Sequence, residues 1–325
     1  LSKMGEFQSL KQIEGLEMSS ISADLYKDGR DDLALFYFSK GANYATMNTS
    51  STIVSETITW NNSSHKKSIK ALMVNTKNAN TFTGKQGKES LDILAKNLSR
   101  ILTLKESKSE GGTSETVRIK DLIFASTGVI GEQFPVNKIK DSLSELVQKL
   151  KSKHNKLFWL KVASGMMTTD TKPKVAYEEL LVGDELVKLC GIAKGSGMIQ
   201  PNMATLLAYV ATDGFAGQEF LKDALVASID QSFNRITVDG ETSTNDSSML
   251  TATGASEVEL DSPAVAPVFQ DELNSLMLEL AQGIIRDAEG ATKFIEIRVI
   301  GGECSDDCLR IAYSIANSPL VKTAF

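Results

Sequence analysis

The chain has few of the residues that mark several large classes of protein. Its 325 residues include only three cysteines, which argues against a disulfide framework and favours free thiols in a reducing compartment such as the cytoplasm. No apolar run approaches the ~20 residues of a transmembrane helix, and the N-terminal stretch LSKMGEFQSLKQIEGLEM lacks the apolar centre of a signal peptide. The net charge of −6 leaves no basic surface for a nucleic acid or an anionic membrane. We therefore expect a cytoplasmic protein with neither kind of partner.

Histidine is scarce as well, and this limits the catalytic chemistry. His65 lies in NNSSHKK and His154 in KSKHNK, both polar, loop-like or helix-end stretches. A serine–histidine–aspartate triad needs an imidazole that a second group holds in place, and neither stretch predicts such surroundings. If the chain catalyses acyl transfer, we expect its base to be a group other than histidine.

Three motifs that resemble ligand sites are better explained without a metal or a nucleotide. GIAKGSGM looks like a phosphate-binding loop, but Lys194 precedes Gly195, whereas a P-loop ends in Gly-Lys-Ser or Gly-Lys-Thr. RITVDGETSTND lacks the spacing of a calcium loop and favours turn hydrogen bonds. Cys304 and Cys308 fall short of the about four ligands of a structural zinc. Lys194 is then either a cation for a substrate carboxylate or a surface charge.

The apolar residues follow both strand-like and helix-like patterns. Buried strands are predicted at residues 33–38, 69–74 and 119–125, and a half-exposed strand at 294–300. Apolar residues at helical spacing predict helices over 90–101, 136–150, 220–229, 269–284 and 309–316. The mixture favours an α/β or α+β protein in which helices cover sheets in layers.

Six stretches are rich in Gly, Thr, Ser and Asn and poor in packing residues. Most of them follow or interrupt a strand-like run, and loops at strand ends are where functional side chains are placed on a rigid scaffold. One such stretch alone is an ordinary turn, but six in one chain indicate a site. They span residues 74–84, 125–131, 166–174, 191–198, 235–246 and 287–293.

Two of these regions suggest nucleophilic catalysis. Thr205 lies between Ala204 and an apolar run, and a threonine becomes a useful nucleophile when its own freed α-amine serves as the base. An α-amine, with a reference pKa of about 7.7–8.0, can accept the hydroxyl proton at neutral pH. Thr127 and Gly128 follow a predicted strand and could offer a backbone N–H and a hydroxyl to an oxyanion. The hypothesis is that the chain cuts itself between Ala204 and Thr205.

The ordered motifs resemble one known family. VNTKNANTFTG, ASTGVIG, MTTDT, KGSGMIQPNMATLLAYVATD, SFNRITVDGETSTND and RDAEGATK are similar to those of the ornithine acetyltransferase family, also called glutamate N-acetyltransferase, of arginine biosynthesis. The resemblance runs from about Gly15 to Phe325. It implies a two-domain fold with layered helices and sheets, similar in architecture to N-terminal-nucleophile hydrolases. It also implies that Thr205 carries an acetyl group from N-acetylornithine to glutamate.

The same resemblance implies the division of the chain and its site. Self-cleavage before Thr205 would give an α chain, residues 1–204, and a β chain, residues 205–325, paired into a heterotetramer in the cytoplasm. No metal or cofactor is implied, and use of acetyl-CoA as a second donor stays open. Thr127 and Gly128 match the oxyanion-hole pair. The substrate-binding positions that the resemblance implies are Thr168, Lys194, Thr205 and Glu289.

The sequence departs from the family pattern at two places, and two other interpretations stay open. The family favours Ser-Gly where this chain has Thr76 and Lys77. The family also continues past Phe325, with a tail that supplies an asparagine and a hydroxyl residue to the substrate. We therefore keep two alternatives, a related amidase or aminopeptidase with the same nucleophile and an inactive truncated fragment.

Overall fold

Eight described strands form two sheet halves that share one long strand. The structure, a computed structural model, describes residues 10–63, 68–108, 116–200 and 206–325. Neighbouring strands follow the order β4-β3-β2-β8-β7-β6-β5, and β1 also pairs with β2. The strands are β1 (Glu17–Ile21), β2 (Leu33–Asn48), β3 (Ile69–Asn75), β4 (Leu122–Ser126), β5 (Lys174–Val182), β6 (Glu185–Lys194), β7 (Leu207–Thr212) and β8 (Ser247–Ala252).

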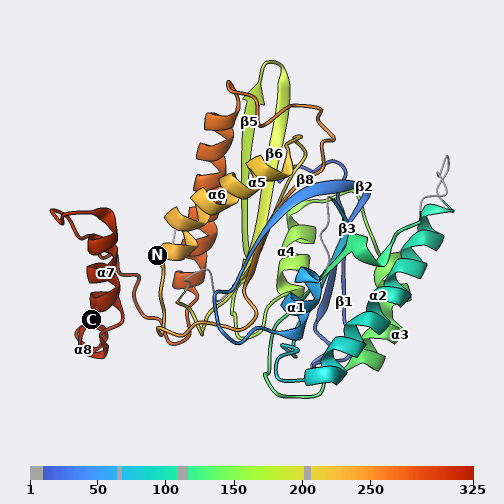
Figure 1. Ribbon diagram of the computed structural model, residues 1–325, viewed down its shortest axis with the longest axis horizontal. Coiled ribbons are helices and arrows are strands. Elements are labelled where there is room, and N and C mark those ends of the chain that lie inside the picture. The colour runs from blue at the N-terminus through green and yellow to red at the C-terminus, as the bar shows by residue number, and fades with distance from the viewer. Residues whose placement is uncertain (1–9, 64–67, 109–115, 201–205) are drawn as a thin grey trace.

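The long strand β2 changes its partner along its length. Residues 33–42 pair antiparallel with β3, and residues 43–48 pair antiparallel with β8. The register to β3 shifts between Tyr37 and Ala42, and Gly41 beside this shift has a φ of +80°, which glycine adopts without a steric penalty. β2 is therefore the curved strand that connects the two halves (Figure 1).

Helices cover the outer face of each sheet half. α5 and α6 lie on one side of the molecule, and α2 and α3 lie on the other (Figure 1). The Ser55 side chain caps the first of the helices by accepting from the Ile58 N–H, and the Asn155 side chain caps α4 in the same way at Phe158. The helices are α1 (Glu56–Asn62), α2 (Gly84–Glu106), α3 (Val136–Gln148), α4 (Lys156–Gly165), α5 (Gln218–Gln231), α6 (Ala266–Arg286), α7 (Ser305–Ala316) and α8 (Pro319–Thr323).

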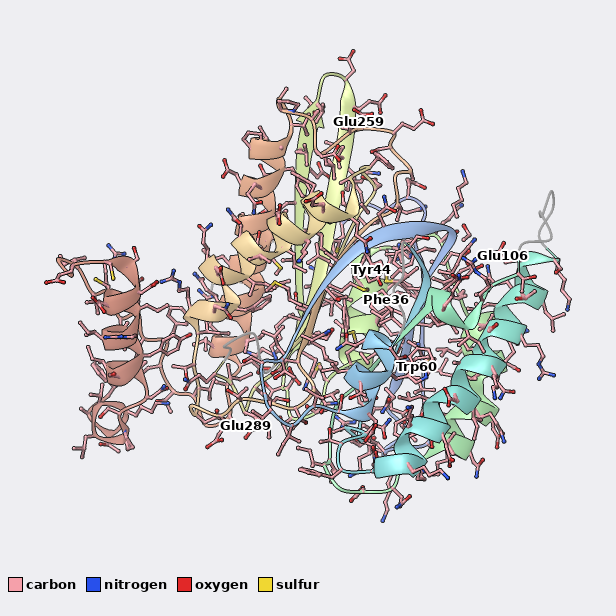
Figure 2. The ribbon with its side chains drawn as sticks, viewed as in Figure 1. Phe36, Tyr44, Trp60, Glu106, Glu259 and Glu289 are labelled. Atoms are coloured by element: carbon pink, nitrogen blue, oxygen red, sulfur yellow. The ribbon has the colours of Figure 1, made fainter. Side chains whose placement is uncertain are left out.

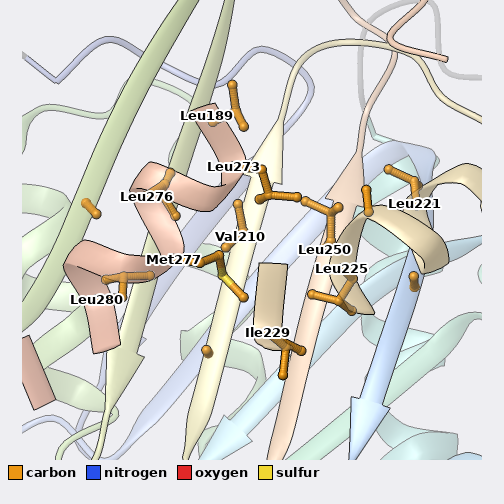
Figure 3. Close-up of a cluster of buried hydrophobic side chains, with 14 of the residues drawn as sticks. Leu189, Val210, Leu221, Leu225, Ile229, Leu250, Leu273, Leu276, Met277 and Leu280 are labelled. Carbon is orange, nitrogen blue, oxygen red and sulfur yellow. The ribbon is translucent and has the colours of Figure 1, made fainter. Parts of the chain in front are cut away.

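Three clusters of buried apolar side chains fill the spaces between the layers. The first lies between β5–β8 and the pair α5 and α6, where Val210 and Leu250 meet Leu225 and Met277 (Figure 3). A second cluster joins the inner faces of the two sheet halves, and a third lies under α2 and α3. β7 is buried on both faces, because Tyr209 belongs to the second cluster and its neighbour Val210 to the first. The layers are therefore helix, sheet, sheet and helix.

Most of the predicted elements are confirmed, and one is wrong. The helices and the strands at 33–38 and 69–74 are present, while the run at 119–125 begins as a short 3-10 turn before β4. Residues 294–300 form no strand, and Phe294, Ile295 and Ile300 are exposed there. Alternation alone does not make a strand, because a strand also needs a partner for its backbone groups, and the described residues supply none at this segment.

α7 and α8 lie at one side of the layered body (Figure 1), and neither contains a buried residue. The Tyr313 hydroxyl of α7 donates to the Asn234 carbonyl at 2.9 Å and so joins this pair to the body. None of the helices that the structure describes combines the length and the apolar content that crossing a membrane would require.

Candidate active site

The six polar loops meet at one place. Loop 191–198 contacts four of the others, and loop 235–246 connects them to the sixth, loop 74–84. The sequence pattern had indicated a site without showing which loops share it, and the hydrogen bonds now join all of them. The contacts are Lys194 with Thr127, Ser196 with Thr169, Met198 with Asp239, Glu289 with Ser196, and Asn245 with Ala79.

The pairing of the strands explains why these loops converge. Lys194, the last residue of β6, lies opposite Leu207, the first residue of β7. Leu207 in turn lies opposite Ser247, the first residue of β8. In the other sheet half, the parallel strands β3 and β4 end side by side. The Asn245 side-chain amide donates to the Ser126 carbonyl at 2.8 Å, so the ends of the two halves meet here.

Lys194 lies at the centre of this meeting point. Its ammonium nitrogen donates to the Thr168 hydroxyl at 2.9 Å and to the Thr127 hydroxyl at 3.1 Å. The residue is only 9% exposed, which rules out the interpretation as a surface charge. Burial lowers the pKa of Lys194, against the opposing attraction of Asp170 and Asp246. An ammonium has three donors, and hydroxyls of the described residues accept from two of them.

Gly128 has a conformation that only glycine tolerates at this point. Its φ is +133°, and an added Cβ would lie 2.2 Å from the carbonyl carbon of Lys77. The Thr127 backbone N–H is already committed, because it donates to the Asn75 carbonyl at 3.0 Å. The remaining donors for an oxyanion are therefore the Thr127 hydroxyl and the Gly128 N–H. Gly128 is exposed, so a small molecule can reach it.

Glu289 closes the other side of the site. It follows the end of α6 (Figure 2), and its backbone N–H donates to the Ser196 carbonyl at 2.8 Å. Its carboxyl group lies against Gly197, where an added Cβ would come within 2.8 Å of the carboxyl carbon. The Glu289 side chain is exposed, and its negative charge partly opposes the lowering of the Lys194 pKa by burial. The structure thus brings Thr127 and Thr168 into contact with Lys194 and joins the loop of Glu289 to the loop of Lys194.

Comparison with known proteins identifies the family. The model of the ArgJ family matches residues 17–325. The chain belongs to the ArgJ family. A curated member, the arginine biosynthesis bifunctional protein ArgJ of Psychrobacter arcticus, is 40% identical to it over an alignment that covers 98% of this chain and 75% of that protein.

Two solved structures support the same fold. The arginine biosynthesis bifunctional protein of Bacillus halodurans matches with a TM-score of 0.51 and 24% identity, over 60% of this chain and 97% of that one. The aminopeptidase of Ochrobactrum anthropi, described as a variant of the Ntn hydrolase fold, matches with a TM-score of 0.53 and 10% identity, over 95% and 96% of the two chains. The layered architecture expected from the sequence is therefore confirmed.

The predicted cleavage site of this ArgJ-family chain, between Ala204 and Thr205, lies outside the described residues. The next residue, Leu206, is described and buried. Lys77, where the resemblance led us to expect glycine, has a φ of +71°. Glycine adopts this left-handed conformation without strain.

The expectation for His154 is corrected by the structure. His65 lies outside the described residues, but His154 is buried and its ring stacks on Phe158, with centroids 5.6 Å apart. Burial lowers the pKa of its imidazole, and Nε2 lies 2.8 Å from the Lys151 carbonyl oxygen. The polar neighbours in the sequence had hidden this burial. Lys151 pairs with Met18 beside β1, so this histidine has a structural role in packing.

Sequence reasoning missed two charged features of the site. Asp246, interpreted only as a turn residue, is buried, and burial raises the pKa of its carboxyl well above the ordinary value despite Lys194 and the Leu206 N–H. Lys174 was not singled out at all, yet it is buried between Asp170 and Asp287. The only signal was that Asp170, Asp246 and Asp287 lie inside three of the six loops, since their pairing depends on the tertiary fold.

Replacing Gly128 with alanine should strongly reduce turnover. The Gly128→Ala Cβ would force the loop away from Lys77 and move the neighbouring N–H, so we expect kcat for acetyl transfer to fall by roughly 10²–10³-fold. Gly131→Ala is the matched control, because Gly131 also has a positive φ but an added Cβ there meets nothing within 4 Å. Steady-state kinetics of both variants would test this, and a Gly128→Ala protein with normal kcat would remove Gly128 from the oxyanion hole.

Proposed function

We propose that this chain transfers an acetyl group from N-acetylornithine to glutamate, with Thr205 as the residue that carries it. Membership of the ArgJ family supports an acetyltransferase of arginine biosynthesis. The observation that carries the proposal is the contact of the Lys194 ammonium with the hydroxyls of Thr127 and Thr168. A buried cation between two hydroxyl groups, beside a glycine N–H, suits a substrate that brings a carboxylate and develops an oxyanion.

Maturation comes first in the proposed sequence of steps. The Thr205 hydroxyl oxygen attacks the Ala204 carbonyl carbon, and the peptide bond between the two residues becomes an ester. One water molecule hydrolyses the ester, leaving a carboxylate on Ala204 and a free α-amine on Thr205. The resulting α chain (1–204) and β chain (205–325) stay together, and we propose that two such pairs form a cytoplasmic heterotetramer.

Acetyl transfer then follows in two halves. The Thr205 oxygen attacks the acetyl carbon of N-acetylornithine while the Thr205 α-amine takes the hydroxyl proton. The Thr127 hydroxyl and the Gly128 N–H hold the oxyanion; the bond from carbon to nitrogen then breaks, and the departing ornithine nitrogen receives that proton. The α-amine of glutamate next attacks the acetyl-threonine ester. It loses its proton to the Thr205 amine, which returns it to the Thr205 oxygen as N-acetylglutamate leaves.

A second acetyl donor is part of the proposal. The curated relatives are named bifunctional, which supports a second activity here, and we propose acetyl-CoA as the alternative donor to the same threonine. The steps use no resident metal or cofactor, since the base is the Thr205 amine and the oxyanion donors belong to the chain.

A product assay tests the proposed function. The purified protein, given N-acetylornithine and glutamate, should produce ornithine and N-acetylglutamate in equal amounts, and mass spectrometry of the protein should find two fragments that meet between Ala204 and Thr205. Free acetate without N-acetylglutamate would instead indicate the hydrolase alternative. No product at all would overturn the proposed function. Acetyl-CoA with glutamate in a parallel reaction measures the second donor.

A further inference from the structure

A buried group of three charges lies behind the substrate-binding residues. The Lys174 ammonium is 2.6 Å from an Asp170 oxygen and 2.6 Å from an Asp287 oxygen, and it also donates to the Gly195 carbonyl at 3.1 Å. The three charged side chains are 4%, 0% and 5% exposed for Lys174, Asp170 and Asp287. We call these three residues the Lys174 cluster.

The two carboxylates of the Lys174 cluster also bind the backbone of the loops. Asp170 accepts from the Gly195 N–H at 2.6 Å and from the Thr168 N–H at 3.1 Å. Asp287 accepts from the Thr171 N–H at 2.9 Å and from the Lys172 N–H at 3.1 Å. One buried cluster thus connects loops 166–174, 191–198 and 287–293.

Each connected loop carries one of the residues that face the substrate. Thr168 donates its own N–H to the Lys174 cluster, Lys194 precedes Gly195, and Glu289 comes two residues after Asp287. These three side chains come from segments that are far apart in the sequence, so their spacing depends on whatever joins the segments. We propose that the Lys174 cluster is a positioning device that sets the spacing of Thr168, Lys194 and Glu289 for the ornithine and glutamate substrates, an inference that rests on the proposed function.

The electrostatics favour a geometric role over a stabilising one. Burial raises the pKa of Asp170, but Lys194, Lys174 and the Gly195 N–H together hold it below the ordinary value. The pKa of Asp287 is also held low, because Lys174 and Thr171 outweigh burial. Both carboxylates are therefore ionised at neutral pH. Buried ion pairs add little net stability because desolvation offsets their attraction. The two carboxylates do, however, orient the backbone N–H groups from which they accept.

An Asp287→Asn variant tests this proposal. The amide keeps the size of the side chain but loses the charge that holds Lys174, so the loops should separate slightly. We expect KM for both N-acetylornithine and glutamate to rise about tenfold or more, with a smaller change in kcat. Self-cleavage should continue, because it uses Thr205 and no bound substrate. Thr171→Ala removes one hydroxyl that bonds Asp287 and should give a smaller rise in KM.

A matched control is available in a buried ion pair away from the Lys174 cluster. Asp213 is buried and lies 2.8 Å from Lys188 of β6, six residues or about 20 Å along the strand from Lys194. Asp213→Asn should weaken folding without changing KM. An unchanged KM in Asp287→Asn, or an equal rise in both variants, would overturn the positioning role, as would a loss of self-cleavage as large as the rise in KM.

Direct binding separates this proposal from the function on which it rests. Calorimetric titration of ornithine into the cleaved wild-type protein should give measurable affinity, and Asp287→Asn should weaken it about tenfold. Wild-type protein that neither binds ornithine nor makes N-acetylglutamate would overturn the proposed function together with the inference. Normal binding by wild type and variant alike would overturn the inference alone.

Discussion

Thr205→Ala is expected to remain one uncut chain and to lose acetyl transfer by roughly 10⁴-fold or more, as removal of a catalytic nucleophile does elsewhere. The alanine has no hydroxyl to attack the Ala204 carbonyl, so the α-amine that would serve as the base is never released. Denaturing electrophoresis measures the cleavage, and the yield of N-acetylglutamate measures the transfer.

Thr205→Ser is the matched control for this substitution. Serine keeps the hydroxyl and, after cleavage, the adjacent amine, so the chain should still divide and retain part of its activity. A Thr205→Ala protein that transfers acetyl groups at the wild-type rate would remove Thr205 as the acetyl carrier. Uncut wild-type protein with full activity would show instead that a different base serves the threonine.

The chemistry of the site could be predicted from sequence because its residue types are unusual for their positions. A glycine after a strand predicts close backbone approach, and Gly128 has the positive φ and the close contact with Lys77 that only glycine allows. A lysine inside a glycine-rich loop indicates either a ligand or a surface charge, and the burial of Lys194 decides between the two. Thr205 itself, being outside the described residues, remains a prediction.

The parts that sequence reasoning missed depend on pairing between distant segments. Lys174 and Asp287 are more than a hundred residues apart, and their contact follows from the packing of α6 on β5. The sequence analysis predicts no strand at β1, β5, β6, β7 or β8. β5 begins and β6 ends inside polar loops that the sequence indicates as parts of the site. At residues 294–300 the sequence predicts a strand that the structure does not have. The apolar and polar residues do alternate there, but no described strand lies beside the segment.

The site buries charged groups of both signs close together. Lys194 and Lys174 bring two cations, while Asp170, Asp246 and Asp287 bring carboxyl groups, and Asp246 has a raised pKa because of its burial. Despite burial, the pKa values of the two carboxyl groups in the Lys174 cluster are instead held below the ordinary value, by Lys194 and Lys174 at Asp170 and by Lys174 at Asp287. The balance leaves Lys194 as the cation nearest to Thr127, where a substrate carboxylate would bind.

Lys174→Met is expected to cost about 3–5 kcal/mol of unfolding free energy at neutral pH, because it leaves two buried carboxylates without their cation. Lys188→Met is the matched control. That side chain is 14% exposed and has one buried carboxylate partner, so a smaller loss is expected. Urea unfolding followed by circular dichroism measures both, and equal losses in the two variants would contradict the expected cost of leaving a second buried carboxylate unpaired.

The pH dependence of the Lys174→Met effect has a definite sign. In the wild type, the folded-state pKa values of Asp170 and Asp287 lie below the ordinary value of 3.8. Their contribution to stability is therefore present above that value and lost as the pH falls through the folded pKa. Without Lys174, burial should raise the pKa values of both carboxyl groups. At low pH these groups then become protonated, and the variant no longer carries the cost of two unpaired buried charges.

The difference in unfolding free energy between wild type and Lys174→Met should therefore be largest near neutrality and shrink below about pH 4. A difference that stays constant from pH 7 to acid would mean that the lost packing of the lysine stem, and not the unpaired carboxylates, causes the destabilisation.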